Sequence, residues 1–343
     1  MKTIDSYQVN NASRIVLNAN ESYKNLPDAI VDEIKENFDK IIYNRYPDNS
    51  AKVLSEAYFE VFNISEDNVM FGNGSDEMLG LIIGLNIKKG KKLYTLKPDF
   101  SMFDYYATFH EGSVIKYQID LDKGFNVLDF IENGKKENVS MILFSNPNNP
   151  TGNLISSDDI KIILNEFKDI PVVIDEAYGE FSNSTMMYEI YNYPNLYVTK
   201  TLSKAYGVAG IRLGMILSNS ENIKNLKEMK VPYNVNSITQ YIGSIIIKHK
   251  KETDEYIKEI IERREKFYNN LISRNYDDLT IYKSFSNFIY FKSKLKSELI
   301  SNFEENGISI RNFNDDSFRI TIGSEEEMEE VLNIIDYTYG GSI

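Results

Sequence analysis

The stretch SMILFSNPNNPTGNLISSDDIKIILNEFKDIPVVIDEAYGEF, residues 140–181, decides the fold class of this 343-residue chain. It contains an apolar run at 140–145, a helical pattern at 156–167 that starts with serines and aspartates, and a second apolar run at 171–175. Two apolar runs joined by a helical pattern are typical of parallel strands with a connecting helix. Serine and aspartate are preferred helix N-caps, so the pattern also predicts where that helix begins.

The same alternation extends along most of the chain in both directions. Further strand candidates lie at 68–71, 92–96, 113–117, 195–200 and 213–217, and helical patterns lie at 75–85 and 100–109. Strands this apolar predict a mostly parallel sheet that is covered on both faces. We therefore expect an α/β protein with a three-layer large domain.

The pattern changes after about residue 220. A long helical region at 237–272 is followed by strand candidates at 279–284, 287–293 and 318–323, and by helices near 294–305 and 325–336. These elements predict a smaller α+β domain. We expect residues 1–44 to form an arm and a helix that pack with it, residues 45–230 the large domain, and residues 231–343 the connecting helix and the small domain.

Composition excludes several classes of protein. The net charge of −13 disfavours nucleic-acid or anionic-membrane binding, although a few local arginines can still bind small anions. The chain has no cysteine, which excludes disulfides and thiolate chemistry, and its two histidines occur in unrelated settings, so we expect no metal site. The start, MKTIDSYQVNNASR, has no apolar run of the kind found in signal peptides, which predicts a cytoplasmic protein.

The segment TKTLSKAYGVAGIRLG, residues 199–214, contains a lysine whose sequence neighbours are unusually small. Lys204 has small neighbours, among them Ser203, Ala205 and Gly207, and Arg212 follows eight residues later. Small residues allow a bulky group to approach, and a desolvated lysine loses its proton more easily and becomes a nucleophile. A lysine that extends to solvent beside a tight turn explains this segment equally well when it is taken alone.

Each of three further segments, taken alone, is explained as a common turn or strand end. Taken together, they predict a ligand-binding site. FGNGSDE (71–77) reads as a strand, a turn and a helix start, FSNPNNPTG (144–152) as a rigid turn after a strand, and PVVIDEAYGEF (171–181) as a strand that ends in a carboxylate. Helix starts bind anions, and ligands bind at the carboxyl ends of strands in open α/β sheets. The combined set is an anion cradle with an arginine, an acceptor carboxylate, polar groups and an amine: Gly74, Ser75, Asp76, Arg212, Asp175, Asn149, Tyr178 and Lys204. Pyridoxal phosphate requires these groups.

At this point the sequence resembles a known family. NPNNPTG, DEAYGEF and SKAYGVAGIR, in that order, are similar to motifs of the fold-type I aminotransferases that use pyridoxal phosphate. LNANES, RYPD, GNGSDE, PDFSMF, PYNVNS, SISIR and FRITIG read like the histidinol-phosphate aminotransferases and their close relatives. The resemblance covers about residues 14 to 340.

The resemblance implies a role for each cofactor residue. Lys204 would bond covalently to the cofactor aldehyde and move the proton of the substrate, Asp175 would pair with the ring nitrogen, and Asn149 and Tyr178 would bond the ring oxygen. Phe100 would stack on the ring. The phosphate would be bound by Gly74, Ser75, Asp76, Thr201, Ser203 and Arg212, and by Tyr46 from the other subunit of a homodimer.

The resemblance also implies a substrate pocket. Arg319, in the FRITIG strand, would bind the carboxylate of glutamate or the phosphate of histidinol phosphate, and Arg311 is a second candidate. Either arginine could instead form a surface salt bridge. The arm residues Asn20 and Tyr23 would help close the pocket. Relatives often have a proline–tyrosine pair here, whereas this chain reads Asn-Glu-Ser-Tyr-Lys without a proline, which puts the substrate preference in doubt.

The leading functional hypothesis is transamination between histidinol phosphate and 2-oxoglutarate in histidine biosynthesis. The alternatives are an aromatic or other amino-acid aminotransferase, and a decarboxylase of threonine phosphate, which starts from the same cofactor chemistry. A regulatory or scaffold protein of this fold would carry a DNA-binding extension or lack the lysine. An NAD-binding oxidoreductase would need a glycine fingerprint that this sequence lacks.

Overall fold

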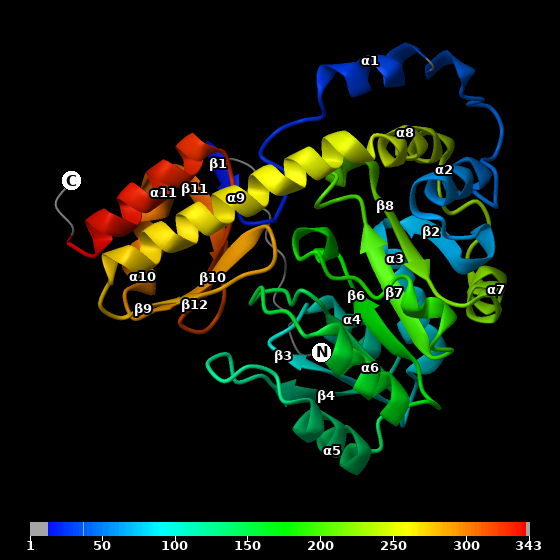
Figure 1. The fold of residues 1–343 in the computed structure, drawn as a ribbon, viewed down its shortest axis with the longest axis horizontal. Helices are drawn as coiled ribbons and strands as arrows, with labels where there is room; N and C mark the ends of the chain where they lie inside the picture. The colour runs from blue at the N-terminus through cyan, green and yellow to red at the C-terminus, as the bar shows by residue number, and fades with distance from the viewer. Residues whose placement is uncertain (1–12, 37, 341–343) are drawn as a thin grey trace.

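The computed structural model describes residues 13–36 and 38–340, which form two sheets with their helices (Figure 1). The larger sheet has the order β2-β8-β7-β6-β5-β3-β4. Its strands are β2 (Val69–Asn73), β3 (Lys92–Lys97), β4 (Ser113–Gln118), β5 (Met141–Ser145), β6 (Val172–Asp175), β7 (Leu196–Thr201) and β8 (Leu213–Leu217). Neighbouring strands are parallel except around β8, which is antiparallel to both β2 and β7. The seven strands predicted for this region are confirmed to within two residues.

Helices cover both faces of this sheet, which confirms the three-layer architecture. One face packs against α2 (Lys52–Phe62), α5 (Val127–Glu137), α6 (Ser157–Glu166) and α8 (Ser237–Lys248). The other face packs against α3 (Gly74–Asn86), α4 (Met102–Phe109) and α7 (Ser220–Met229). Alternate strand residues supply the two cores: in β5, Ile142 and Phe144 face the first set of helices and Met141 and Leu143 the second. Because both of its faces are buried, the central strand β5 (MILFS) is almost continuously apolar.

The smaller sheet has the order β1-β11-β12-β10-β9. It contains β1 (Ile15–Leu17), β9 (Leu279–Tyr282), β10 (Phe288–Ser293), β11 (Ile308–Asn312) and β12 (Ser317–Thr321). Its core includes side chains from α9 (Lys250–Arg274), α10 (Lys296–Glu305) and α11 (Glu325–Thr338). The N-terminal strand β1 pairs in parallel with β11, so that Ile15 lies opposite Ile308.

The long helical region predicted at 237–272 consists of two helices that meet at His249. Figure 1 shows α9 (yellow) running from α8, beside the large sheet, to α10 and α11. Helix α1 (Asp28–Glu36) contacts α8, and its Ile30 belongs to the apolar cluster of the larger sheet. In the described part of the chain, no helix is both long enough and apolar enough to cross a bilayer.

Candidate active site

The motif residues meet at one edge of the larger sheet, where strands β2, β5, β6 and β7 end. The Asn149 turn follows β5, Asp175 is the last residue of β6, and Thr201 is the last residue of β7. Arg212 directly precedes β8, and β8 is antiparallel to β7, so Arg212 lies at the same edge. Sequence segments up to about 140 residues apart are therefore combined into one site, as the strand-end rule predicts.

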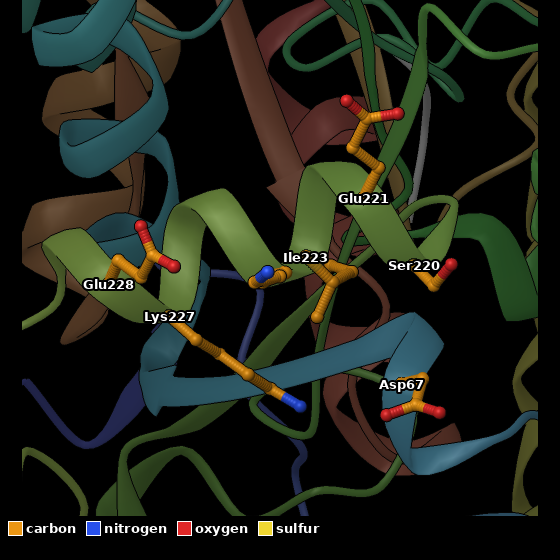
Figure 2. Close-up of a pocket in the computed structure, with 7 residues that line it drawn as sticks. Asp67, Ser220, Glu221, Ile223, Lys227 and Glu228 are labelled. Carbon is orange, nitrogen blue, oxygen red and sulfur yellow. The ribbon is translucent and has the colours of Figure 1, made fainter.

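A different hollow lies on the opposite edge (Figure 2). It is formed by α7 and the turn before β2, and its lining residues are Asp67, Ser220, Glu221, Ile223, Lys224, Lys227 and Glu228. Lys227 Nζ donates to the carbonyl of Glu66 at 2.8 Å. Charges of both signs are mixed along this hollow, and none of the sequence motifs reaches it. We therefore take the edge at the strand carboxyl ends as the active site.

The anion cradle is built where β8 packs tightly against the start of α3. A Cβ atom on Gly214 would lie 2.2 Å from both the Gly74 carbonyl carbon and the Ser75 nitrogen, so only glycine fits there. Gly74 has φ +73°, and a Cβ on it would lie 2.7 Å from Arg212 Nη2. Asn73 forms no side-chain cap on α3, which leaves the first-turn N–H groups directed at the cradle.

Hydroxyl groups and a guanidinium complete the cradle. Thr201 Oγ1 lies 3.0 Å from Ser203 Oγ, and Arg212 Nη1 donates to the same Ser203 oxygen at 3.4 Å. Arg212 Nη2 lies 3.6 Å from a carboxylate oxygen of Asp76 and is half-exposed. The cradle thus combines a helix N-terminus, two hydroxyls and a half-exposed cation, which fits a phosphate group.

Asp175 is a buried carboxylate with an exposed fraction of only 4%. It accepts a hydrogen bond from Thr199 Oγ1 at 2.8 Å. Burial raises its pKa to about 7, and the charge of Asp76 adds to the shift. A buried carboxylate is stabilised by a cation, so this position suits the protonated ring nitrogen of pyridoxal phosphate.

Lys204 lies in the turn after β7 and its amine faces the N-terminal arm. Its Nζ donates to the carbonyl of Ala19 at 2.7 Å. Burial, together with the cation of Arg319, lowers the pKa of Lys204 to about 8. A larger fraction of this lysine is therefore an uncharged nucleophile near neutral pH than of an exposed lysine.

This pKa makes a testable prediction. The rate at which pyridoxal phosphate attaches to the apo-protein should rise with pH through about 8 and then level off, because only the neutral amine reacts. Stopped-flow absorbance across pH 6 to pH 10.5 measures it. A rate that still climbs towards the ordinary lysine value of 10.5 would contradict the assignment.

Arg319 connects the smaller sheet to the cofactor residues. Its exposed fraction is 4%, its Nη1 donates to Asn149 Oδ1, and its Nη2 donates to the carbonyl of Asn18 at 2.9 Å. The guanidinium lies 5.0 Å from the ring centre of Phe288. Arg311 is the cross-strand neighbour of Arg319, and its guanidinium lies 5.7 Å from the ring centre of Phe313.

The N-terminal arm crosses the site and is bonded to it at several points. Asn20 Nδ2 donates to Tyr178 Oη at 2.9 Å, and Asn20 Oδ1 accepts from Thr321 Oγ1 at 3.0 Å. Tyr23 donates to Glu259 on α9, and the guanidinium of Arg263 stacks 4.8 Å from the Tyr23 ring centre. This contact with α9 fixes the tyrosine in an arm without the expected proline.

Two aromatic residues complete the predicted set. Phe100 follows β3 and packs edge-on against Phe103 at a centroid distance of 5.6 Å. Tyr46 is 82% exposed and stacks on Tyr233 at 4.8 Å, so within one chain it does not join the other site residues. Sequence reasoning missed Thr199, the donor to Asp175, and Asp99, which directly precedes Phe100. The only signal for Asp99 was a carboxylate between a proline and an aromatic residue.

The cradle, the buried carboxylate and the lysine fit pyridoxal phosphate at its phosphate, its ring nitrogen and its aldehyde. Within the described residues no cluster of three or more histidine and carboxylate side chains could hold a metal ion. The fold and the site therefore define a fold-type I enzyme whose cofactor is pyridoxal phosphate.

Comparisons with known proteins identify the family. The family described as "Aminotransferase class I and II" matches residues 12–335. The histidinol-phosphate aminotransferase of Clostridium novyi is 38% identical, over 94% of this chain and 91% of that protein. The crystal structure of the Clostridium acetobutylicum histidinol-phosphate aminotransferase has a TM-score of 0.85 at 23% identity, over 96% of this chain and all of that one. The Sinorhizobium meliloti enzyme, in complex with pyridoxal-5′-phosphate, also scores 0.85, at 20% identity over 96% and 91%. The chain belongs to the class I and II aminotransferase family and is a pyridoxal-phosphate-dependent aminotransferase.

Proposed function

We propose that this aminotransferase exchanges the amino group between histidinol phosphate and 2-oxoglutarate, as a step of histidine biosynthesis. The observation that carries the proposal is the enclosed guanidinium of Arg319 in the same site as Lys204. Histidinol phosphate offers a phosphate and glutamate a carboxylate, and one guanidinium can bond both in a bidentate manner. The names of the relatives at 38% identity support the same substrate.

The proposed chemistry assigns a task to each group of the site. Bound pyridoxal phosphate supplies an electron sink for the bond broken at the substrate Cα. Lys204 Nζ attaches the cofactor and moves the proton at the substrate Cα, which its lowered pKa favours. Asp175 keeps the ring nitrogen protonated, and Asn149 and Tyr178 bind the ring oxygen. Arg319 orients the anionic end of the substrate.

A panel of amino donors tests the substrate. With 2-oxoglutarate as acceptor, we expect kcat/KM for histidinol phosphate to exceed that for phenylalanine and tyrosine by at least about tenfold, because these lack the phosphate that a charged hydrogen bond would bind. A higher value for phenylalanine would favour an aromatic aminotransferase. Release of carbon dioxide from threonine phosphate would identify a decarboxylase instead.

We also propose that the enzyme is a homodimer in the cytoplasm whose sites are shared. Exposed apolar side chains in two segments that meet where Tyr46 stacks on Tyr233 support this: Ile42, Tyr43, Tyr46, Met229, Val231 and Tyr233. In the dimer Tyr46 would reach the phosphate cradle of the partner subunit. We further propose the division into an arm with α1 (1–44), a cofactor domain (45–230) and a connecting and small domain (231–343).

Sedimentation equilibrium tests the dimer. The wild-type chain should sediment at twice its monomer mass at micromolar concentration, and Val231→Glu should shift it towards monomer, because a charge buried in an apolar interface lacks a partner. Leu128→Glu, at an exposed apolar residue of α5, is the matched control and should leave the mass unchanged. A monomeric wild-type chain with full activity would contradict a shared site.

A further inference from the structure

Asp99 is a carboxylate beside the cofactor residues to which the chemistry above gives no task. It lies two residues after β3, directly before Phe100. Asp99 Oδ1 accepts from the main-chain nitrogen of Phe100 at 2.8 Å and from the hydroxyl of Ser145. Asp99 Oδ2 accepts from the main-chain nitrogen of Ser145 at 3.2 Å and from Thr95 Oγ1 at 3.5 Å. Both of its oxygens thus accept hydrogen bonds. The donors belong to β3, to the residue Phe100 that follows it, and to the neighbouring strand β5.

Ser145 extends this network to the turn that carries Asn149. Ser145 is the last residue of β5, has an exposed fraction of 1%, and lies opposite Asp175 in the register of β5 and β6. Its hydroxyl accepts from the main-chain nitrogen of Asn149 at 2.9 Å and donates to Asp99. A serine hydroxyl has one donor and can accept further bonds, so it can serve both partners at once.

The network therefore fixes two groups that are expected to contact the cofactor ring. Asp99 Oδ1 holds the backbone of Phe100, the residue predicted to stack on the ring. The same oxygen accepts from the Ser145 hydroxyl, which in turn holds the backbone of Asn149. The Asn149 amide is predicted to bind the ring oxygen and accepts a bond from Arg319. Burial raises the pKa of Asp99 to about 8, and the charge of Asp175 contributes to the shift.

We propose that Asp99 is a positioning residue that, through Phe100 and Ser145, sets the relative placement of the stacking ring and of Asn149 and so orients the pyridine ring of the cofactor. The proposal rests on the proposed cofactor roles of Phe100 and Asn149. Asp99 does not itself need to contact the ring. Its effect should therefore appear in the affinity and orientation of the bound cofactor, and substrate binding should change less.

The test measures cofactor binding by the full-length apo-protein. Asp99→Ala should raise the dissociation constant of pyridoxal phosphate about tenfold, which corresponds to one buried hydrogen-bond partner at about 1.4 kcal/mol per factor of ten. It should also change the circular dichroism that the protein induces in the cofactor absorption band. Asp99→Asn keeps one acceptor oxygen and the shape of the side chain, so its effect should be smaller.

Two further variants separate positioning from general destabilisation. Ser145→Ala should have the same effects, and the double variant Asp99→Ala/Ser145→Ala should be little worse than either single one, because both act through one network. Asp104→Asn removes another carboxylate of the same segment, one that is ion-paired with Lys116, and should leave the dissociation constant and the spectrum unchanged.

The outcomes distinguish the possible failures. If the wild-type chain does not bind pyridoxal phosphate, the proposed cofactor roles are wrong. If the wild type binds it and Asp99→Asn and Asp99→Ala bind equally tightly with an unchanged spectrum, the inference about Asp99 is overturned. Additive effects of the Asp99 and Ser145 substitutions would also overturn it, because they would exclude a shared network. If Asp99→Ala does not fold, Asp99→Asn alone decides.

Discussion

Replacing Lys204 with alanine should lower kcat for transamination by on the order of 10⁴-fold, the upper end of what a positioned acid–base group contributes. The substitution removes the amine that attaches the cofactor and the base that moves the Cα proton. Borohydride reduction of the loaded wild type should leave a stable adduct on the peptide that contains residue 204, and the variant should leave none there. Single-turnover kinetics and peptide mass spectrometry measure the two effects.

The matched control for this experiment is Lys161→Ala. Lys161 lies on α6 and forms an ion pair with Glu189 at 2.8 Å, away from the strand ends. Its removal should leave kcat within about twofold, because the pair is partly exposed to solvent and such surface ion pairs contribute little. If Lys204→Ala keeps more than a tenth of the wild-type kcat, or if the adduct forms on another lysine, the identification of Lys204 is wrong.

Replacing Arg319 with alanine should lower kcat/KM for anionic substrates by about 10²- to 10³-fold, which corresponds to about 3–4 kcal/mol for a buried charged partner. The loss includes the bond to Asn149 and the packing over Phe288. Arg319→Lys therefore tests the substrate contact more specifically. Lysine keeps the charge and loses the bidentate fork, and we expect it to recover about a tenth of the wild-type value.

Arg319 should also control the pH profile. Its cation lowers the pKa of Lys204, so its removal should raise the pH at which the cofactor attaches, whereas Arg319→Lys should not. Arg311→Ala is the comparison at the cross-strand position and should cost less than Arg319→Ala. A larger loss from Arg311→Ala, with little change from Arg319→Ala, would exchange the two assignments.

The larger sheet could be predicted from the sequence because its signal is local. Most of its strands are short apolar runs, and such runs also indicate that both faces of the sheet are buried. Helix α2 was missed although Leu54, Ala57 and Tyr58 line its buried face. Ala51 at its N-cap forms no side-chain cap, and the main-chain nitrogen of Lys52 donates instead to Asp48, at 2.8 Å, which lies three residues before that position. Strand β1 was missed because three residues are too few for a periodic pattern and its partner is β11, at the other end of the chain.

The candidate site, like the fold, has a part that could be predicted from the sequence and a part that could not. The motif residues Lys204, Asp175 and Arg212 lie at strand ends, and the strand-end rule placed them together correctly. The bonds between Asn20 and Tyr178 and between Asp99 and Ser145 join segments 158 and 46 positions apart, and no local pattern records such a pairing. Tyr46 is a third case, because the cofactor phosphate that it is predicted to contact is bound by another subunit.

The pairing of β1 with β11 has a consequence for synthesis on the ribosome. Asn18 and Arg319, which are bonded in the finished enzyme, are 301 positions apart. The first strand to emerge must therefore wait for nearly the last part of the polypeptide before it can dock. A nascent chain that ends near residue 300 would already contain the complete larger sheet and Lys204, yet it would lack Arg319 and β11, the strand with which β1 pairs. Competence for turnover should thus arise only at the end of translation.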